Sequence, residues 1–418
     1  MDIDVPPTSA PMPEYPSPPF CFKSLPAELR FSVIESFGQS LPDHPPDLDT
    51  LRSLSLVDRE CSRFACSVLW RRVEFHSKSN EQLETFLQHI APNRRALIRE
   101  ADLGGAYQRA PTDDAGMQAI QQRFMLYMRL VEVLPALSSL DIKALPFTNP
   151  ILVITAPTLW STSSSFNSTL RTLSISGYPQ PLIDGDTLSL VFNRFPLLSS
   201  LSLTLIGPCL NGSFAPSLRR LERLRRLELR NVECVDARLL EGGATWSADI
   251  KELVISDCTN LDLDSTIQLI RQLAPTLETL DLLMEHAALP LHPEIPLPTD
   301  SDSSLAPPPP SPSSLPLAPL PLPSLHHLSL ELSPSPSTAL LLALHAPHLT
   351  SLTVLHPSPS PEGLAAIVGL VERSPQLMQV RIVVGRETLE GTTQEEVEAL
   401  VGGCQRRGVK LGWDLLDG

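Results

Sequence analysis

The sequence predicts an α/β fold in which a short helical module precedes a curved solenoid with parallel strands on its concave face. Two observations lead to this prediction. A six-residue pattern, apolar-x-x-apolar-x-apolar, recurs at least nine times between residues 137 and 382, and its starts are mostly 24 to 33 residues apart. That spacing is the period of a repeat protein rather than of a single globular domain. Residues 21–75, in contrast, carry apolar side chains at helical spacing.

Composition limits the classes of partner. The chain has 418 residues, a hydrophobic fraction of 42% and a formal net charge of −15. This charge argues against nucleic acid and against an anionic membrane surface as the main partner. No apolar run is long enough for a membrane span, and the acidic, Pro-rich start does not resemble a targeting signal. The seven scattered cysteines suit buried thiols in a reducing compartment, so we expect a cytoplasmic or nuclear protein.

Proline marks two segments that we expect to be disordered. Seven of the 43 prolines fall in the first 19 residues, which predicts a flexible leader at 1–20. Thirteen more lie between Pro290 and Pro323, where the spacing between the sixth and seventh copies of the pattern widens to 48 residues. We therefore predict a disordered insertion at 289–323, because a long surface loop costs little stability.

The first helix of the module is predicted to begin at Pro26. Proline suits the first helical position, and Glu28 follows within the first turn. Leu29, Val33 and Phe37 then recur every four residues, which places them on one helix face.

Two further helices are predicted from their capping residues. Asp47 precedes one apolar-spaced segment, and Asp58 precedes another that runs through Cys61 to Trp70. Three short helices in about 50 residues cannot bury all of their apolar side chains among themselves. The sequence therefore implies a partner for this module.

The ordered set of motifs in this segment resembles an F-box. The set consists of Leu25-Pro26-x-Glu28-Leu29, Leu51-x-x-Leu54-x-Leu56-Val57-x-Arg59 and Leu69-Trp70-Arg71. The resemblance implies a docking module, at 21–75, for the Skp-type adaptor of cullin-RING ubiquitin ligases. The residues that it places at the adaptor are Leu25, Pro26, Leu29, Val33, Leu54, Val57 and Trp70. The alternative for some of them, Leu54 and Leu69 especially, is that they hold the three helices together.

Within each copy of the repeated pattern, the fourth and sixth residues point to the same side of a strand. The segments between strands carry helical signals, as at 338–345 and 361–373, where Ser, Thr or Pro begins an apolar run. Residues 98–103 provide a degenerate first strand. The arrangement from 95 to 418 resembles a leucine-rich-repeat protein, and the repeat at Ile250, with Cys258 at its ninth position, is closest to the cysteine-containing subtype.

The concave face is the predicted target-binding surface. Arg226, Glu228 and Arg230 alternate with buried leucines and lie in a segment with six arginines. This segment is either a solvated edge of one repeat or a site that recognises an acidic or phosphorylated target, because arginine binds such anions in bidentate fashion. The target-binding candidates are Arg226, Glu228, Arg230, Glu252, Asp281, His327, Glu331 and Arg381.

No constellation of residues suggests catalysis. The chain has no Gly-rich phosphate loop, no nucleophile elbow and no histidine pair at metal spacing. We therefore expect no cofactor, no metal and no catalytic residue. The leading interpretation is a substrate-recognition subunit that binds a Skp-type adaptor, and through it a cullin, and presents an unknown protein target. The alternative is a non-catalytic leucine-rich-repeat scaffold that does not assemble into a ligase.

Overall fold

The structure is a computed structural model. It describes residues 22–38, 47–75, 78–104, 114–143, 169–177, 189, 192–193, 195–206, 215–233, 235, 246, 249–283, 318–331, 336–356, 361–385 and 394–416. The chain divides into two compact units between Arg72 and Val73. The predicted leader at 1–20 and residues 289–317 of the predicted insertion lie outside the described residues.

The first unit contains three short helices, which follow a single 3-10 turn, η1 (Phe22–Ser24). The helices are α1 (Ala27–Phe37), α2 (Leu48–Leu54) and α3 (Arg59–Leu69). A small core joins them, and Phe22, Phe37, Leu54, Phe64, Val68 and Leu69 pack around it in partly buried positions. The fully buried members of this core are Ile34, Leu51, Cys61 and Ala65.

Two of the predicted helix starts are confirmed by side-chain capping. The Asp47 carboxylate accepts a hydrogen bond of 2.9 Å from the Thr50 amide, and the Asp58 carboxylate accepts one of 2.8 Å from the Cys61 amide. Each satisfies one of the backbone donors that a helix leaves open in its first turn. Pro26 lies one residue before α1, at its N-cap, and no side-chain hydrogen bond caps that helix.

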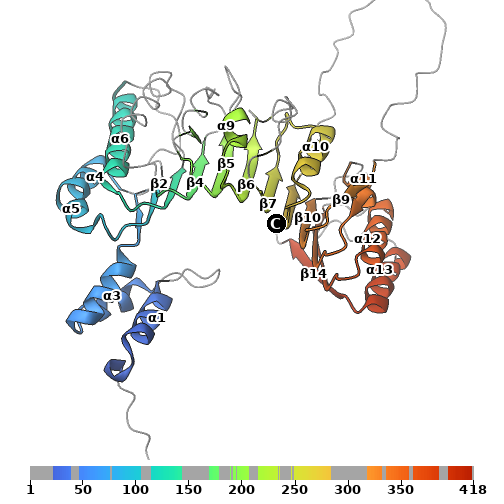
Figure 1. Ribbon diagram of the computed structural model, residues 1–418, viewed down its shortest axis with the longest axis horizontal. Coiled ribbons are helices and arrows are strands. Elements are labelled where there is room, and N and C mark those ends of the chain that lie inside the picture. The colour runs from blue at the N-terminus through green and yellow to red at the C-terminus, as the bar shows by residue number, and fades with distance from the viewer. Residues whose placement is uncertain are drawn as a thin grey trace, which may run out of the picture. The chain divides into compact units, whose positions relative to one another are not determined.

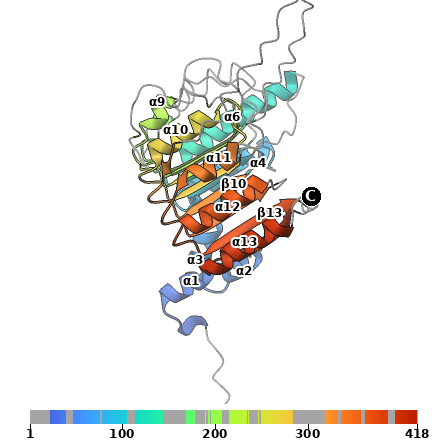
Figure 2. The same cartoon turned by 90° about the vertical axis from the view of Figure 1, so that its right-hand side faces the viewer.

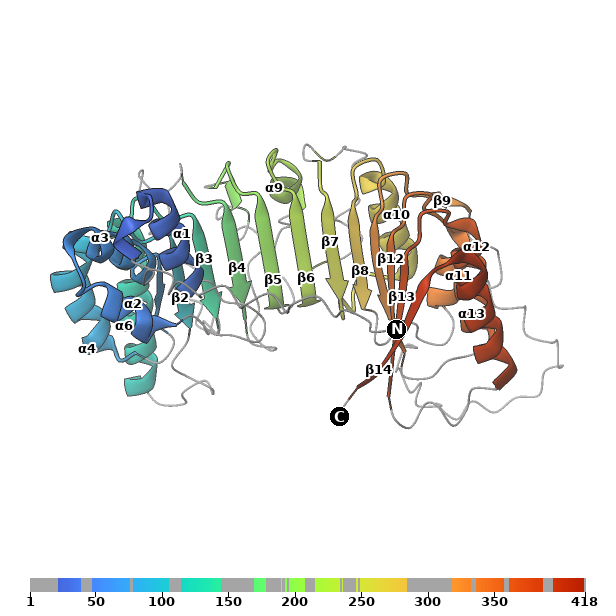
Figure 3. The same cartoon turned by 90° about the horizontal axis from the view of Figure 1, so that it is seen from below.

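In the second unit the described residues form a sheet of twelve strands that lie in chain order, with parallel registers between the neighbours from β2 to β14 (Figure 3). All nine copies of the sequence pattern form strands of this sheet, as predicted. The strands are β1 (Arg72–Glu74), β2 (Glu100–Gly104), β3 (Ser139–Lys143), β4 (Thr172–Ser176), β5 (Ser200–Ile206), β6 (Arg226–Val232), β7 (Glu252–Ser256), β8 (Thr279–Leu283), β10 (His327–Glu331), β12 (Ser351–His356), β13 (Gln379–Gly385) and β14 (Lys410–Leu416).

Helices cover the convex side of this curved sheet (Figures 1 and 2). The helix predicted at 361–373 is confirmed as α12 (Pro361–Arg373). The helix predicted at 338–345 is present as α11 (Pro336–Ala343), but Leu344 and His345 form a short strand instead. No helix in the described ranges combines the length and the apolar character needed to cross a membrane. The other helices are α4 (Asn80–Thr85), η2 (Phe86–Ile90), α5 (Ala91–Arg94), α6 (Asp114–Val133), α9 (Ala215–Arg219), α10 (Leu263–Leu273) and α13 (Gln394–Arg407).

The second unit is therefore a curved leucine-rich-repeat solenoid. The fourth residue of each pattern copy is an apolar side chain that is at most 2% exposed. Stacking of repeats makes these side chains a continuous core, because no single repeat can bury its own apolar face. The residues of this column are Leu140, Leu173, Leu201, Leu227, Leu253, Leu280, Leu328, Leu352 and Val380.

A backbone ladder fixes the spacing of the repeats where each strand begins. The carbonyl of the second pattern residue accepts two amide hydrogen bonds from the next repeat. Ser199 and Ser200 donate to the Arg171 carbonyl at 2.7 and 3.0 Å, and Arg225 and Arg226 donate to the Ser199 carbonyl at the same distances. Because this ladder uses main-chain groups, it tolerates the varied side chains at the second and third positions.

The structure corrects the predicted limits of the solenoid. Its unit begins at Val73 rather than at 95, since β1 and the helices α4 to α5 belong with the repeats. The predicted insertion is also too long at its C-terminal end. Leu320 and Leu322 are at most 1% exposed, and β9 (Leu320–Pro321) pairs in parallel with β11 (Leu344–His345). Residues 318–323 are thus folded, because their leucines pack into the repeat that follows.

The eighth pattern position adopts a left-handed backbone in three consecutive repeats. Its φ angles are 54° at Leu205, 52° at Asn231 and 51° at Asp257. Asparagine and aspartate tolerate this region, whereas a leucine in it is sterically strained. In the preceding repeat the same position is Gly177, where an added Cβ would lie 2.5 Å from the Leu205 carbonyl oxygen.

We expect Leu205→Asn to raise the free energy of unfolding by about 0.5–1 kcal/mol, because asparagine accepts the left-handed conformation more readily than leucine. Urea denaturation followed by circular dichroism measures the change. The matched control is the reverse substitution in the next repeat, Asn231→Leu, which should destabilise the fold by a similar amount. A lower stability of Leu205→Asn would mean that packing of the leucine outweighs its backbone strain.

The predicted cysteine position bonds neighbouring repeats. The buried Cys258 thiol donates weak hydrogen bonds to the carbonyls of Leu229, at 3.6 Å, and Ser256, at 3.5 Å. Burial raises the pKa of this thiol from 9.0 to about 11. The neutral form is therefore the one that the folded state holds.

Because the pKa of Cys258 is higher in the folded than in the unfolded state, its contribution to stability is complete below pH 9 and is lost as the pH rises through about 11. Between pH 8 and pH 10.5 we expect this thiol to remove about 2 kcal/mol from the free energy of unfolding. Denaturant titrations of wild type and Cys258→Ala at both pH values isolate this contribution. An equal pH dependence in the two proteins would contradict it.

Candidate functional site

The first unit exposes several large apolar side chains, which we call the module's apolar surface. Leu56 is 87% exposed, Val57 55%, Leu29 53%, Leu48 44% and Val33 38%. Isolated exposed leucines are ordinary, but five within one small unit are typical of a protein-binding surface.

The seven residues predicted to contact an adaptor divide into two groups. Pro26, Leu29, Val33 and Val57 are exposed. They lie at the N-cap of α1, on α1 itself or in the turn after α2. Leu25, Leu54 and Trp70 are only partly exposed. Leu54 packs against the core, as does Leu69, which fits the alternative that these two hold the helices together. Two exposed leucines, Leu48 and Leu56, were not among the residues predicted to contact an adaptor, although Leu56 is part of the second F-box-like motif.

The exposed residues are held in place by ordered backbone and by ion pairs. In the turn between α2 and α3, the Leu56 amide donates to the Ser53 carbonyl at 3.0 Å and the Val57 amide donates to the Leu54 carbonyl at 3.2 Å. Three ion pairs connect the N-terminal segment and α1 to α3 and its ends: Arg30–Glu60 at 2.8 Å, Arg71–Glu35 at 3.2 Å and Lys23–Asp58 at 3.8 Å. The module's apolar surface is therefore part of the ordered fold, and its side chains are not exposed by local unfolding of the helix ends.

The concave face of the solenoid is the second candidate site. Alternation along each strand turns every second side chain to this face, and the registers align these side chains across neighbouring strands. On β4 and β5 the outward residues are hydroxyls only: Thr172, Ser174, Ser176, Ser200, Ser202 and Thr204. The next strands carry the charged residues singled out from the sequence.

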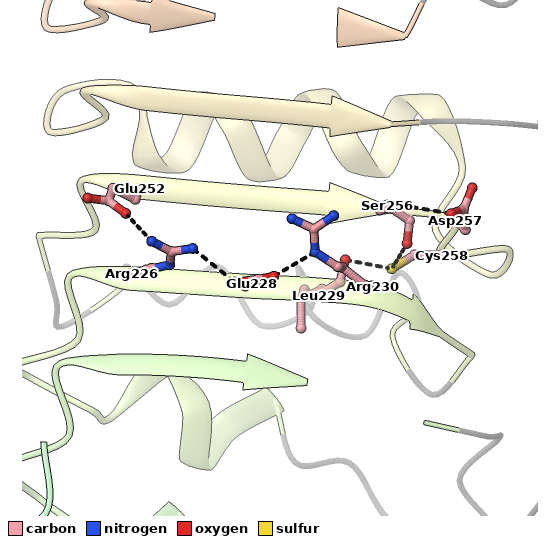
Figure 4. A network of polar contacts seen from close by, with 8 residues as sticks. All are labelled: Arg226, Glu228, Leu229, Arg230, Glu252, Ser256, Asp257 and Cys258. Atoms are coloured by element: carbon pink, nitrogen blue, oxygen red, sulfur yellow. Dashed lines mark hydrogen bonds and ion pairs between the residues drawn. The ribbon is translucent and has the colours of Figure 1, made fainter. Parts of the chain in front are cut away.

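Four of the predicted target-binding residues form one ion-pair network on β6 and β7 (Figure 4). Arg226 contacts Glu228 and Glu252, each at 3.1 Å, and the Arg230 Nε contacts Glu228 at 2.6 Å. The partner of Arg226 on β7 is fixed by strand register, because Arg226 lies opposite Glu252. Two arginines therefore face two glutamates, and the network is close to neutral.

The carboxylates at this place titrate differently. Burial raises the pKa of Glu228, but hydrogen bonds from Arg230 and Arg226 outweigh it, so that the pKa is lowered overall. Burial also raises the pKa of Asp281, and there the hydrogen bond from Ser329 and the charge of Arg230 only partly offset it. Glu228 is thus a satisfied anion, whereas Asp281 is a poorly solvated one.

The remaining predicted residues lie further along the face. His327 and Glu331 are on β10, and Arg381 on β13 forms an ion pair with Asp414 of β14. The eight candidates do not form one cluster, since β12 separates β10 from β13. Within the described ranges, no three His, Cys, Asp or Glu side chains are arranged to hold a metal ion.

Comparison with known proteins gives little beyond this geometry. No family model and no curated protein matches the chain. Among solved structures, the crystal structure of the Rad7 and Elc1 complex in yeast matches with a TM-score of 0.35 and 15% identity, covering 92% of this chain and 91% of that chain. A likeness at this level does not support an inference about function.

Proposed function

We propose that this chain is the substrate-recognition subunit of a Skp-cullin-F-box type ubiquitin ligase. The first unit binds a Skp-type adaptor, which links the chain to a cullin, and the solenoid binds the protein target. Ubiquitin transfer is carried out by other subunits, and this chain supplies proximity and orientation.

The observation that carries the proposal is the module's apolar surface. Leu29, Val33 and Val57 occupy positions of the F-box pattern and are between 38% and 55% exposed in a unit whose own core is complete. Exposed apolar area of this kind is stabilised when a partner covers it, at about 25 cal/mol per Å². Apolar side chains that no internal packing requires are best explained by such a partner.

The concave face supports the second half of the proposal. Its outward side chains are polar and of mixed charge, as in a binding surface for another protein. It is also built on rigid strands, so that its groups keep fixed spacings.

The proposal is tested by mixing the purified full chain with a purified Skp-type adaptor and following the mixture by gel filtration. We expect a stable 1:1 complex that retains a cullin in a second step. A chain that elutes alone, while remaining folded by circular dichroism, would instead be a scaffold outside any such ligase.

A further inference from the structure

The middle of the concave face leaves a hydrogen-bond donor and an acceptor both unused. The Arg230 Nε contacts Glu228, whereas its two Nη atoms turn away from that carboxylate, over β7 (Figure 4). Neither Nη atom has a hydrogen-bond partner in the described part of the chain. On β8, the Oδ1 atom of Asp281 is buried and has no hydrogen-bond partner there either. An unused buried oxygen of a carboxylate is costly unless a ligand supplies a donor.

These two groups flank one strand. Glu228, Val254 and Asp281 lie opposite one another on β6, β7 and β8. Strands are about 4.8 Å apart, so that β6 and β8 are separated by about 10 Å. The Arg230 side chain spans part of this distance, but its nitrogen atoms do not come within 4.0 Å of the Asp281 carboxylate oxygens, which is the limit for an ion pair. On β7, Val254 lies opposite Glu228 and Asp281 at an outward position, and this apolar residue is only 6% exposed.

We propose that Arg230 and Asp281 together form a binding site for a primary carboxamide, the side chain of an asparagine or glutamine in the target protein. The carboxamide oxygen accepts a hydrogen bond from an Arg230 Nη atom. The carboxamide nitrogen donates to the Oδ1 atom of Asp281. One planar group thus satisfies both unused partners, and Val254 excludes water beneath it.

Charged side chains fit this place less well. A carboxylate or phosphate would be attracted by Arg230 but repelled by Asp281, Glu228 and Glu252. An ammonium or guanidinium group would be attracted by Asp281 but repelled by Arg230 and Arg226. A neutral group with one donor and one acceptor avoids both penalties, because burying an unpaired charge costs more than burying a hydrogen-bonded amide.

This inference deepens the proposed role of the concave face in target binding, and it is tested without the adaptor. The purified full chain is used to select peptides from a phage library of random 12-residue sequences. We expect the selected peptides to share an asparagine or glutamine at one position. Replacing that residue with alanine should weaken binding at least about tenfold, the loss expected for a hydrogen-bonded pair that involves charged groups.

Two variants should change the preference in opposite directions. Arg230→Met leaves Asp281 without an opposing cation and should shift the selected residue to lysine or arginine. Asp281→Leu leaves the Arg230 Nη atoms without an opposing anion and should shift it to aspartate or glutamate. Arg381→Met, on β13 of the same face, is the matched control and should leave the preference for a carboxamide unchanged. Thermal unfolding by circular dichroism confirms that each variant is folded.

Three results would overturn the inference. The first is selection of acidic or of basic peptides by the wild-type chain. The second is equal affinity for peptides from a library that lacks asparagine and glutamine, since backbone amides would then suffice. The third is an unchanged preference in both variants. None of these results bears on adaptor binding, so that a failure here leaves the gel-filtration test of the proposed function intact.

Discussion

Replacing both Leu29 and Val57 with aspartate is expected to weaken binding of a Skp-type adaptor by at least about 100-fold. Both side chains are more than half exposed, at 53% and 55%, so the substitutions leave the core of the module intact. Each loses about 0.8–1.5 kcal/mol of apolar burial on binding, half the value for a fully exposed side chain, and adds a carboxylate that would have to be desolvated. A loss of 1.4 kcal/mol is about tenfold in affinity, so two such losses give the expected effect.

Isothermal titration of the adaptor into the full chain measures this loss. Met378 provides the matched control, since it is 63% exposed in the solenoid unit. Met378→Asp adds the same charge to another exposed apolar position and should leave adaptor affinity within about twofold of wild type. Equal losses in the control and in the double variant would point to a general effect of charge rather than to a docking surface.

The second large effect is expected in the stability of the solenoid's N-terminal end. Arg123 of α6 is 3% exposed and acts as a polar clamp. Its Nη atoms donate to the carbonyls of Lys78, at 2.5 Å, and Phe75, at 2.6 Å, and its Nε donates to the Tyr127 hydroxyl at 2.7 Å. The Tyr127 hydroxyl in turn donates to the Gly104 carbonyl at the end of β2. Arg123 therefore ties α6 to the segments after β1 and β2.

Arg123→Met is expected to lower the free energy of unfolding by about 3–5 kcal/mol, because it removes the hydrogen bonds of a buried guanidinium to the Phe75 and Lys78 carbonyls and to the Tyr127 hydroxyl. Arg129 lies on the same helix and is exposed, so Arg129→Met is a matched control that should change stability by at most about 0.5 kcal/mol. Urea denaturation of both variants, followed by circular dichroism, gives the comparison. Similar stabilities would mean that water replaces the guanidinium at the Phe75 and Lys78 carbonyls.

Local patterns predicted most of the secondary structure. The strand at each copy of the pattern follows from the alternation of buried and outward residues, which depends only on neighbours in sequence. The caps at Asp47 and Asp58 are equally local, because a carboxylate bonds to an amide three residues later in the chain. The helix at 361–373 was located to the residue by its proline start and its apolar spacing.

The degenerate strand predicted at 98–103 is present as β2 (Glu100–Gly104), but two strands without the full pattern were missed. The strand β14 begins at Lys410 and carries Gly412 and Trp413 where other repeats have a polar residue and an aliphatic one. It joins the sheet through its register with β13, in which Val380 lies opposite Leu411. The three-residue strand β1 is too short for any period to appear in the sequence. Both β1 and β14 form only by pairing with a neighbouring strand, β2 and β13 respectively.

The candidate sites show the same division. The sequence predicted that Arg226, Glu228 and Arg230 face outward, and it left open whether they form a solvated edge or an anion site. Only the register between β6 and β7 brings Glu252 to Arg226 and makes the network close to neutral. The residue with an unused acceptor, Asp281, lies 51 positions after Arg230 in the chain, and no local pattern relates the two.

The sequence by itself determined the repeat architecture, the outward positions of each strand and the apolar excess of the N-terminal module. These properties follow from the periodicity and composition of short segments, in which the residues that matter are close together in sequence. The tertiary structure decided which apolar residues of the module remain exposed, with Leu51 buried and Leu56 open to solvent five residues later. It also decided which charges neutralise one another on the concave face. Both outcomes depend on contacts between segments far apart in the chain, and burial and electrostatics act through distance in space rather than in sequence.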